Sequence, residues 1–156
     1  MESIEWTEIH DNLQLVMKRE LETMRQLLDN MNLEEQFILR KEKKYWGSMM
    51  EERAHLIDQL SEIRQSKLII TEKLESITQR SNAPLEELLP EAHTNSWEVL
   101  SLRDQMVTLL ERMNLQTSRN EMLMQLERIP APQVNKVKKK ISIATLPSED
   151  YKEKDE

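Results

Sequence analysis

The chain has 156 residues, of which 33% are charged and only one is glycine. So few turn-forming residues exclude most all-β architectures and predict an all-α fold. The net charge of -7 argues against nucleic acid as a partner, because phosphate binding needs a concentrated basic surface. The absence of cysteine excludes disulfides and thiolate metal sites.

The N-terminal stretch MESIEWTEIHDN is acidic and lacks the apolar segment of a secretory signal. No apolar run in the chain approaches the roughly 20 residues that a membrane span requires. We therefore expect a cytoplasmic protein without stable membrane insertion.

The first half of the chain carries one long apolar stripe with helical spacing. Steps of three and four residues of this kind are typical of coiled-coil-like helices. The charges at Glu35 and Glu42 interrupt the stripe, and the sequence RKEKKYWGS around them contains the only glycine. We place a turn between Arg40 and Gly47, which predicts helices over about residues 5–40 and 44–79. One continuous helix is the alternative. The stripe consists of Leu13, Met17, Leu21, Met24, Leu28, Met31, Ile38, Tyr45, Met49, Leu56, Leu60, Ile63, Ile70, Leu74 and Ile77.

A proline-bearing connector, QRSNAPLEELLPEAHTNS, separates this stripe from a third predicted helix at about 96–127. Asn95 or Ser96 suits its N-cap, and Pro130 with Pro132 ends it. We predict an elongated antiparallel three-helix arrangement over residues 1–128, treated as one domain. Residues 129–156 have low hydrophobicity and no period, which predicts a disordered tail.

No catalytic, cofactor or metal motif is present, so we expect no enzymatic activity. Glu52 and His55 have the Glu-x-x-His spacing of di-iron bundles, but those sites need the motif twice. We interpret this pair as part of a solvated polar face.

The third helix has an apolar face that is wider than two neighbouring helices would cover. An uncovered face of this kind predicts a partner site, and an amphipathic helix is its natural partner. Polar residues interrupt the face at Gln116, Thr117 and Asn120. They either fix the register of a buried seam or bond to a bound segment. The predicted site comprises Leu102, Met106, Leu109, Leu110, Met113, Gln116, Asn120, Leu123 and Met124.

The predicted tail contains a short basic and aliphatic segment. Its lysines Lys138, Lys139 and Lys140 precede the alternating Ile141 and Ile143. We interpret the segment as a solvated tail, with a short docking element as the alternative.

Four stretches of the chain, read in order, resemble the FlgN-like export chaperones of flagellar type III secretion. They are ELETMRQLLDNMNLEEQFIL, MMEERAHLIDQLSEIRQSKLII, APLEELLP and LRDQMVTLLERMNLQTSRNEMLMQL. Together they cover roughly residues 10–127. The chain departs from the family at RKEK, where a Gly-Asp break is usual, and at Thr117, where an asparagine is common.

The resemblance implies an antiparallel three-helix protein that holds the C-terminal helical region of a secreted hook-associated or filament-type subunit. Such a chaperone prevents premature polymerisation and presents the subunit to the export apparatus. It implies no cofactor and places binding on the third-helix residues matched to the family. Two alternatives stay open: a stalk component that engages a secretion ATPase, and a coiled-coil scaffold or adaptor that forms a homodimer. The matched residues are Leu102, Met106, Leu109, Met113, Asn120 and Leu123.

Overall fold

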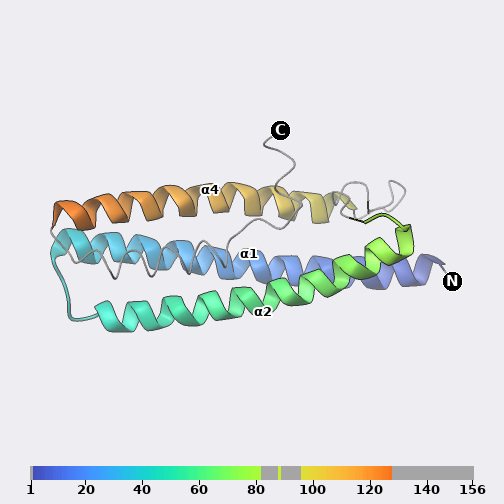
Figure 1. Ribbon diagram of the computed structural model, residues 1–156, viewed down its shortest axis with the longest axis horizontal. Helices are drawn as coiled ribbons and strands as arrows, with labels where there is room; N and C mark the ends of the chain where they lie inside the picture. Colours follow the sequence, from blue (N-terminus) through green and yellow to red (C-terminus); the bar gives the residue numbers. More distant parts are fainter. Residues whose placement is uncertain (1, 82–87, 89–95, 128–156) are drawn as a thin grey trace. The chain divides into compact units, whose positions relative to one another are not determined.

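The computed structural model describes residues 2–81, 88 and 96–127. Its three long helices are α1 (Glu2–Arg40), α2 (Trp46–Thr78) and α4 (Ser96–Leu126), shown in Figure 1. The helices pack against one another, and the described residues contain no strand, so the predicted all-α three-helix fold is confirmed. The predicted tail lies outside the described residues.

The chain folds back between α1 and α2, as the interrupted stripe predicted. Lys41 adopts a left-handed backbone conformation with φ of 55°. Its N–H donates to the carbonyl of Ile38 (3.2 Å), and the N–H of Glu42 donates to that of Phe37 (3.0 Å). These two bonds form a Schellman motif, which satisfies carbonyls left open at a helix C-terminus. The continuous-helix alternative is therefore wrong.

The end of α2 has the same left-handed C-cap. Gln79 has φ of 57°, and the N–H of Arg80 donates to the carbonyl of Glu75 at 3.2 Å. Glycine usually occupies the left-handed position because a Cβ is strained there. Lys41 and Gln79 take that position here, so neither helix end carries the glycine signal that would mark it in the sequence.

The chain divides into two compact units, and each helix contributes a segment to both. Unit 1 comprises Met1–Leu21 and Glu62–Val107, and unit 2 comprises Glu22–Ser61 and Thr108–Leu146, as far as these ranges are described. Within either unit, α2 runs antiparallel to α1 and α4 runs parallel to α1 (Figure 1). Because α1 and α4 run in the same direction, residues from the N-terminal parts of both helices meet in unit 1. Gln14 Nε2 of α1 donates to Glu98 Oε2 of α4 at 2.6 Å.

The core of unit 1 forms from one apolar face of each helix segment. Leu88, a described residue between α2 and α4, is also buried in it. Ile77 belongs to the predicted stripe, but its side chain is exposed. The buried apolar residues of this unit are Ile9, Leu13, Met17, Leu21, Ile63, Leu74, Leu88, Val99, Leu102 and Met106.

The core of unit 2 departs from the predicted stripe at two positions. Leu27 is fully buried where Leu28 was expected, and Leu28 is only half-buried. Tyr45 is exposed because it lies in the turn, where its ring stacks on Phe37 with centroids 6.3 Å apart. The buried apolar residues are Met24, Leu27, Met31, Ile38, Met49, Leu56, Leu60, Leu109, Met113 and Met124.

Candidate partner-binding surface

The structure buries most of the third-helix face that was predicted to bind a partner. In unit 1, Leu102 and Met106 are buried. In unit 2, the other seven predicted residues are buried or half-buried, and Met113 among them is 0% exposed. The buried members of unit 2 are Leu109, Met113, Asn120 and Met124, and the half-buried members are Leu110, Gln116 and Leu123.

The expectation that this face is uncovered is therefore wrong. Its apolar side chains contribute to the core of their unit, and in unit 2 α4 bonds directly to α1. The sequence predicts an apolar face on α4 that is wider than two neighbouring helices would cover. Apart from Arg103, the buried residues of α4 recur at three, four or seven residues, so within each unit they form one face that the neighbouring helices cover. The predicted docking residues Lys138, Lys139, Lys140, Ile141 and Ile143 lie outside the described residues.

A buried polar cluster joins all three helices of unit 2. We call it the polar layer, and it comprises Asn30, Glu34, Arg53 and Asn120. Arg53 is 2% exposed, and its guanidinium donates from Nε to Asn30 Oδ1 (2.6 Å) and from Nη1 to Glu34 Oε2 (2.9 Å). Asn30 in turn donates from Nδ2 to the carbonyl of Met49 at 3.0 Å. A buried carboxylate is thus paired with a buried cation.

Asn120 attaches α4 to the polar layer. Its Nδ2 donates to the carbonyl of Met31 (2.8 Å) and to Glu34 Oε1 (2.6 Å), while its Oδ1 accepts from Gln116 Nε2 (2.8 Å). Both ends of the amide are therefore occupied within unit 2. Of the two interpretations left open for these polar residues, the geometry favours a register device, since a buried amide pairs only in one alignment of the helices.

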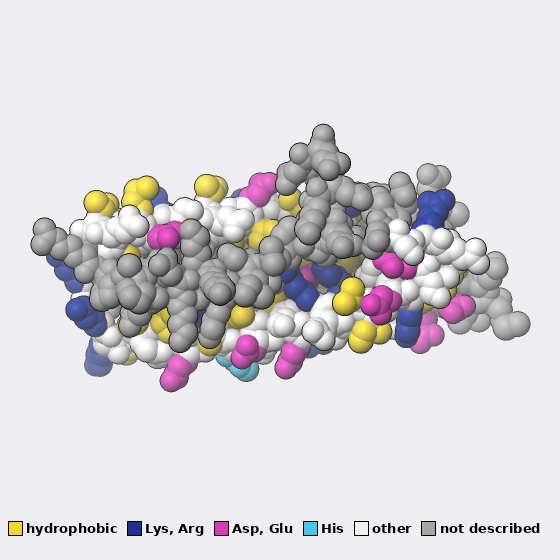
Figure 2. Space-filling view, viewed as in Figure 1, with side chains coloured by type: hydrophobic (Ala, Val, Ile, Leu, Met, Phe, Trp, Pro, Cys, Tyr) yellow, Lys and Arg dark blue, Asp and Glu magenta, His cyan; other side chains and the backbone are white. Residues whose placement is uncertain are grey.

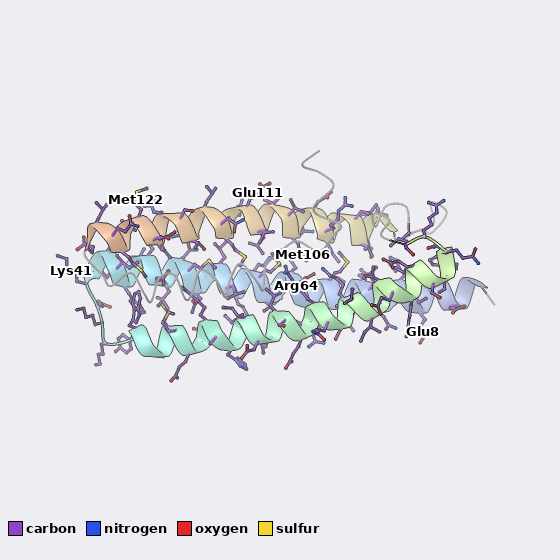
Figure 3. All side chains as sticks on the ribbon, viewed as in Figure 1. Glu8, Lys41, Arg64, Met106, Glu111 and Met122 are labelled. Atoms are coloured by element: carbon purple, nitrogen blue, oxygen red, sulfur yellow. The ribbon has the colours of Figure 1, made fainter. Side chains whose placement is uncertain are left out.

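Unit 1 contains a second buried ion cluster, formed by Glu20, Arg64 and Lys67. The Glu20 side chain is 0% exposed and accepts from Lys67 Nζ (2.7 Å) and from Arg64 Nε (3.0 Å). Arg64 extends from α2 toward α1, as Figure 3 shows. One anion therefore meets two cations in the interior of this unit.

The sequence contains a signal for these clusters. Three of the charged members, Glu34, Arg53 and Lys67, take positions in the three-to-four spacing where an apolar residue would otherwise continue the stripe. Glu34 lies between Met31 and Ile38, and Arg53 lies between Met49 and Leu56. Glu34 lies on α1 and Arg53 on α2, so opposite charges that interrupt the two stripes could have identified this pair.

The side of α4 that faces away from the core of unit 2 carries three exposed apolar residues. We call Leu115, Met122 and Leu126 the α4 stripe, and their exposed fractions are 72%, 63% and 72%. At about 100° per residue, their spacing places them within roughly 40° of one another. Figure 2 shows hydrophobic side chains along this edge, and Figure 3 shows Met122 pointing outward.

The charges around the α4 stripe are mixed. Arg119 pairs with Glu35 of α1, and Lys41 Nζ pairs with Glu127 at 3.3 Å. Glu111 points outward from α4, one turn before the stripe (Figure 3). Neither sign of charge dominates around the stripe. A partner of this surface would therefore be selected by apolar contact rather than by charge.

The described residues supply no arrangement for metal chemistry. No group of three or more His, Cys, Asp or Glu among them could hold a metal ion. Glu52 and His55 are both exposed on α2, in line with a solvated polar face. None of the helices that the structure describes is long and apolar enough to cross a membrane.

No family model, curated protein or solved structure matches the chain.

Proposed function

We propose that this chain is an export chaperone of the flagellar or a related type III secretion system. It binds the C-terminal amphipathic helical region of a secreted filament-type or hook-associated subunit in the cytoplasm. Binding keeps the subunit from polymerising early and presents it to the export apparatus. The sequence resemblance suggests this class of protein, and the α4 stripe is the structural observation that supports a binding role.

The proposal moves the contact surface from the buried face of α4 to its exposed face. Leu115, Met122 and Leu126 repeat at seven and four residues, which is the spacing that an amphipathic partner helix matches. The buried face cannot bind a partner without dismantling the core. The exposed face can do so while the polar layer stays intact.

The size of the α4 stripe fits a complex that must later release its cargo. Burying three such side chains contributes about 4–6 kcal/mol before the costs of association. A micromolar complex needs about 8 kcal/mol net, so polar contacts along the flanks must add to the stripe. The expected affinity is therefore moderate.

The proposal is tested with purified C-terminal fragments of the filament-type and hook-associated subunits from the native host. Isothermal titration calorimetry measures binding to the full chain and to Leu115→Asp/Met122→Asp. The matched control is Asn114→Asp, which adds a carboxylate to an exposed α4 position about 100° from the stripe. Circular dichroism confirms that all variants stay helical.

We expect one subunit fragment to bind the wild type and the control equally. The double variant should bind at least tenfold more weakly, because about 1.4 kcal/mol or more of apolar contact is lost. Equal binding by all three proteins would remove the stripe as the site. No binding of any fragment to the wild type would refute the chaperone function itself.

A further inference from the structure

The turn that joins α1 to α2 is basic, although the chain as a whole is acidic. Residues 40–46 contain four cations and one acid, Glu42, which gives them a net charge of +3 against -7 for the whole chain. All four cations are exposed, and Figure 2 shows Lys and Arg side chains gathered at this end of α1 and α2 in unit 2. We call these cations, together with Tyr45, the basic turn. The cations are Arg40, Lys41, Lys43 and Lys44.

The helix ends account for only part of this charge. Arg40 and Lys41 lie at the C-terminus of α1, where the helix dipole favours cations, and Lys41 Nζ pairs with Glu127 at 3.3 Å. Lys43 and Lys44 lie directly before α2, whose first turn contains no acidic residue. The positive end of the α2 dipole disfavours cations at this position. The helix dipoles therefore do not explain why these two lysines are placed here.

The basic turn holds an aromatic ring beside its lysines. Tyr45 is 52% exposed, and its ring stacks on Phe37 with a centroid distance of 6.3 Å. Lys44 Nζ lies 5.4 Å from the centre of the Tyr45 ring, and Leu39, in the last turn of α1, is 51% exposed. Tyrosine has an apolar ring and a polar hydroxyl, and such side chains are enriched where a bilayer meets water. The turn thus combines exposed cations with side chains suited to the boundary between lipid and water.

The form of the basic turn favours a flat anionic surface over a peptide or a nucleic acid. Sites for those partners commonly line a groove that follows the bound backbone, whereas these cations project from a short turn. A flat anionic surface meets projecting cations together and needs no complementary shape. We infer that the basic turn binds reversibly to the surface of a bilayer that contains anionic lipids.

The strength of this binding follows from the charge of the turn. Near an anionic leaflet each Lys or Arg strengthens binding about fivefold. Counting Glu42 and Glu127 against the four cations leaves a net charge of +2, which corresponds to binding about 25-fold tighter than to a neutral bilayer. The surface field falls off within about 8 Å at physiological salt. Glu51, the first acid of α2, lies about 8 Å along the helix from Trp46, so acids farther along weaken the attraction little.

Bilayer binding is tested with the full chain and two kinds of vesicle, one of phosphatidylglycerol with phosphatidylcholine and one of phosphatidylcholine alone. Cosedimentation measures the bound fraction in about 0.1 M salt, where the screening length is about 10 Å. The wild type is compared with Lys43→Gln/Lys44→Gln and with Lys43→Arg/Lys44→Arg, which keeps the charge. The matched control Lys18→Gln/Lys73→Gln removes the same charge from two exposed lysines of unit 1. Circular dichroism checks that every variant stays helical.

We expect the wild type to bind the anionic vesicles at least tenfold more tightly than the neutral ones. Raising the salt to about 1 M should abolish this difference, since the screening length falls to about 3 Å. Lys43→Gln/Lys44→Gln should bind at least tenfold more weakly, whereas the control and the arginine variant should stay within about twofold of the wild type. Equal binding to both kinds of vesicle overturns the inference, as does unchanged binding by the glutamine variant or an equal loss in the control.

Soluble polyanions distinguish the bilayer from other acidic partners. Polyglutamate stands for an acidic protein segment and oligothymidine for a nucleic acid, each at the same concentration of negative charge as the anionic vesicles. Tighter binding to either polyanion than to the vesicles, lost in Lys43→Gln/Lys44→Gln, assigns the basic turn to that partner and overturns the inference.

Bilayer binding does not depend on the proposed function. The basic turn and the α4 stripe share no residue, and the vesicle assay contains no subunit fragment. If the vesicles are not bound, the chaperone function still stands on its own test. If no subunit fragment is bound, the bilayer contact still stands on the vesicle assay.

Discussion

Substituting Arg53 tests whether the polar layer stabilises unit 2 in the way its geometry indicates. Arg53→Met removes the two bonds to Asn30 and Glu34 and leaves the Glu34 carboxylate, 5% exposed, without its cation. Breaking a buried pair from one side costs about 3–5 kcal/mol, which is a large part of the 5–15 kcal/mol typical of a domain. At a urea m-value of about 1.5 kcal/mol/M, the unfolding midpoint should fall by roughly 2–3 M.

The double substitution Glu34→Met/Arg53→Met should recover most of this loss. Asn30 keeps its bond to the carbonyl of Met49, and Asn120 keeps its bond to that of Met31. Replacing both charges by apolar groups is often neutral or stabilising, because no ion then has to leave water. Arg53 favours this outcome, since its buried Nη2 has no hydrogen-bond partner in the structure. Asn30 Oδ1 loses the bond from Arg53 Nε, so we expect the double variant to lie within about 2 kcal/mol of the wild type.

Arg119→Met is the matched control, because Arg119 pairs with Glu35 at the surface of the same unit. An exposed pair contributes less than about 1 kcal/mol. Urea unfolding followed by circular dichroism measures all three variants. The polar layer does not stabilise unit 2 through its ion pair if Arg53→Met costs no more than Arg119→Met, or if the double variant is as unstable as Arg53→Met.

Three further predictions follow from burial and backbone geometry. Met113→Asp should unfold unit 2, since the Met113 side chain is 0% exposed. Met122→Asp should change the free energy of unfolding by less than about 0.5 kcal/mol. Thermal unfolding of both variants checks which face of α4 belongs to the core. Glu20→Gln should cost about 2–4 kcal/mol because it removes the buried carboxylate that accepts from Lys67 and Arg64, and urea unfolding would contradict this if the midpoint is unchanged. Lys41→Gly should raise stability by about 0.5–1 kcal/mol because φ is 55° there, while Lys44→Gly, in the same turn, serves as the comparison in the same assay.

Local sequence features were sufficient for the helices and the position of the turn. Apolar spacing of three and four residues, two proline-bearing segments and the break near Arg40 predicted the helix bounds to within three residues. These signals act over one or two turns of chain and need no knowledge of neighbours. The ends of α1 and α2 were less sharply marked, because Lys41 and Gln79 occupy positions that glycine usually takes.

The partner surface could not be predicted in the same way. A wide apolar stripe shows that a helix has a face to bury, but its neighbours decide which residues they cover. For α4 the residues expected outside, such as Met113, are inside, and Leu115 and Met122 are outside. Likewise, Glu35 was expected to interrupt the seam, whereas Glu34 is the buried acid, because only Glu34 faces both Arg53 and Asn120.

The sequence by itself therefore determined that this protein is all-α, where the three long helices of the described residues lie to within three residues, and where the chain folds back. Periodicity, prolines and charge act locally, so they can be recognised without coordinates. Only the tertiary structure decided which side of each helix is buried and how the charges pair. The acids on α1 and the bases on α2 are far apart in the chain, and their pairing becomes favourable only when folding removes them from water together.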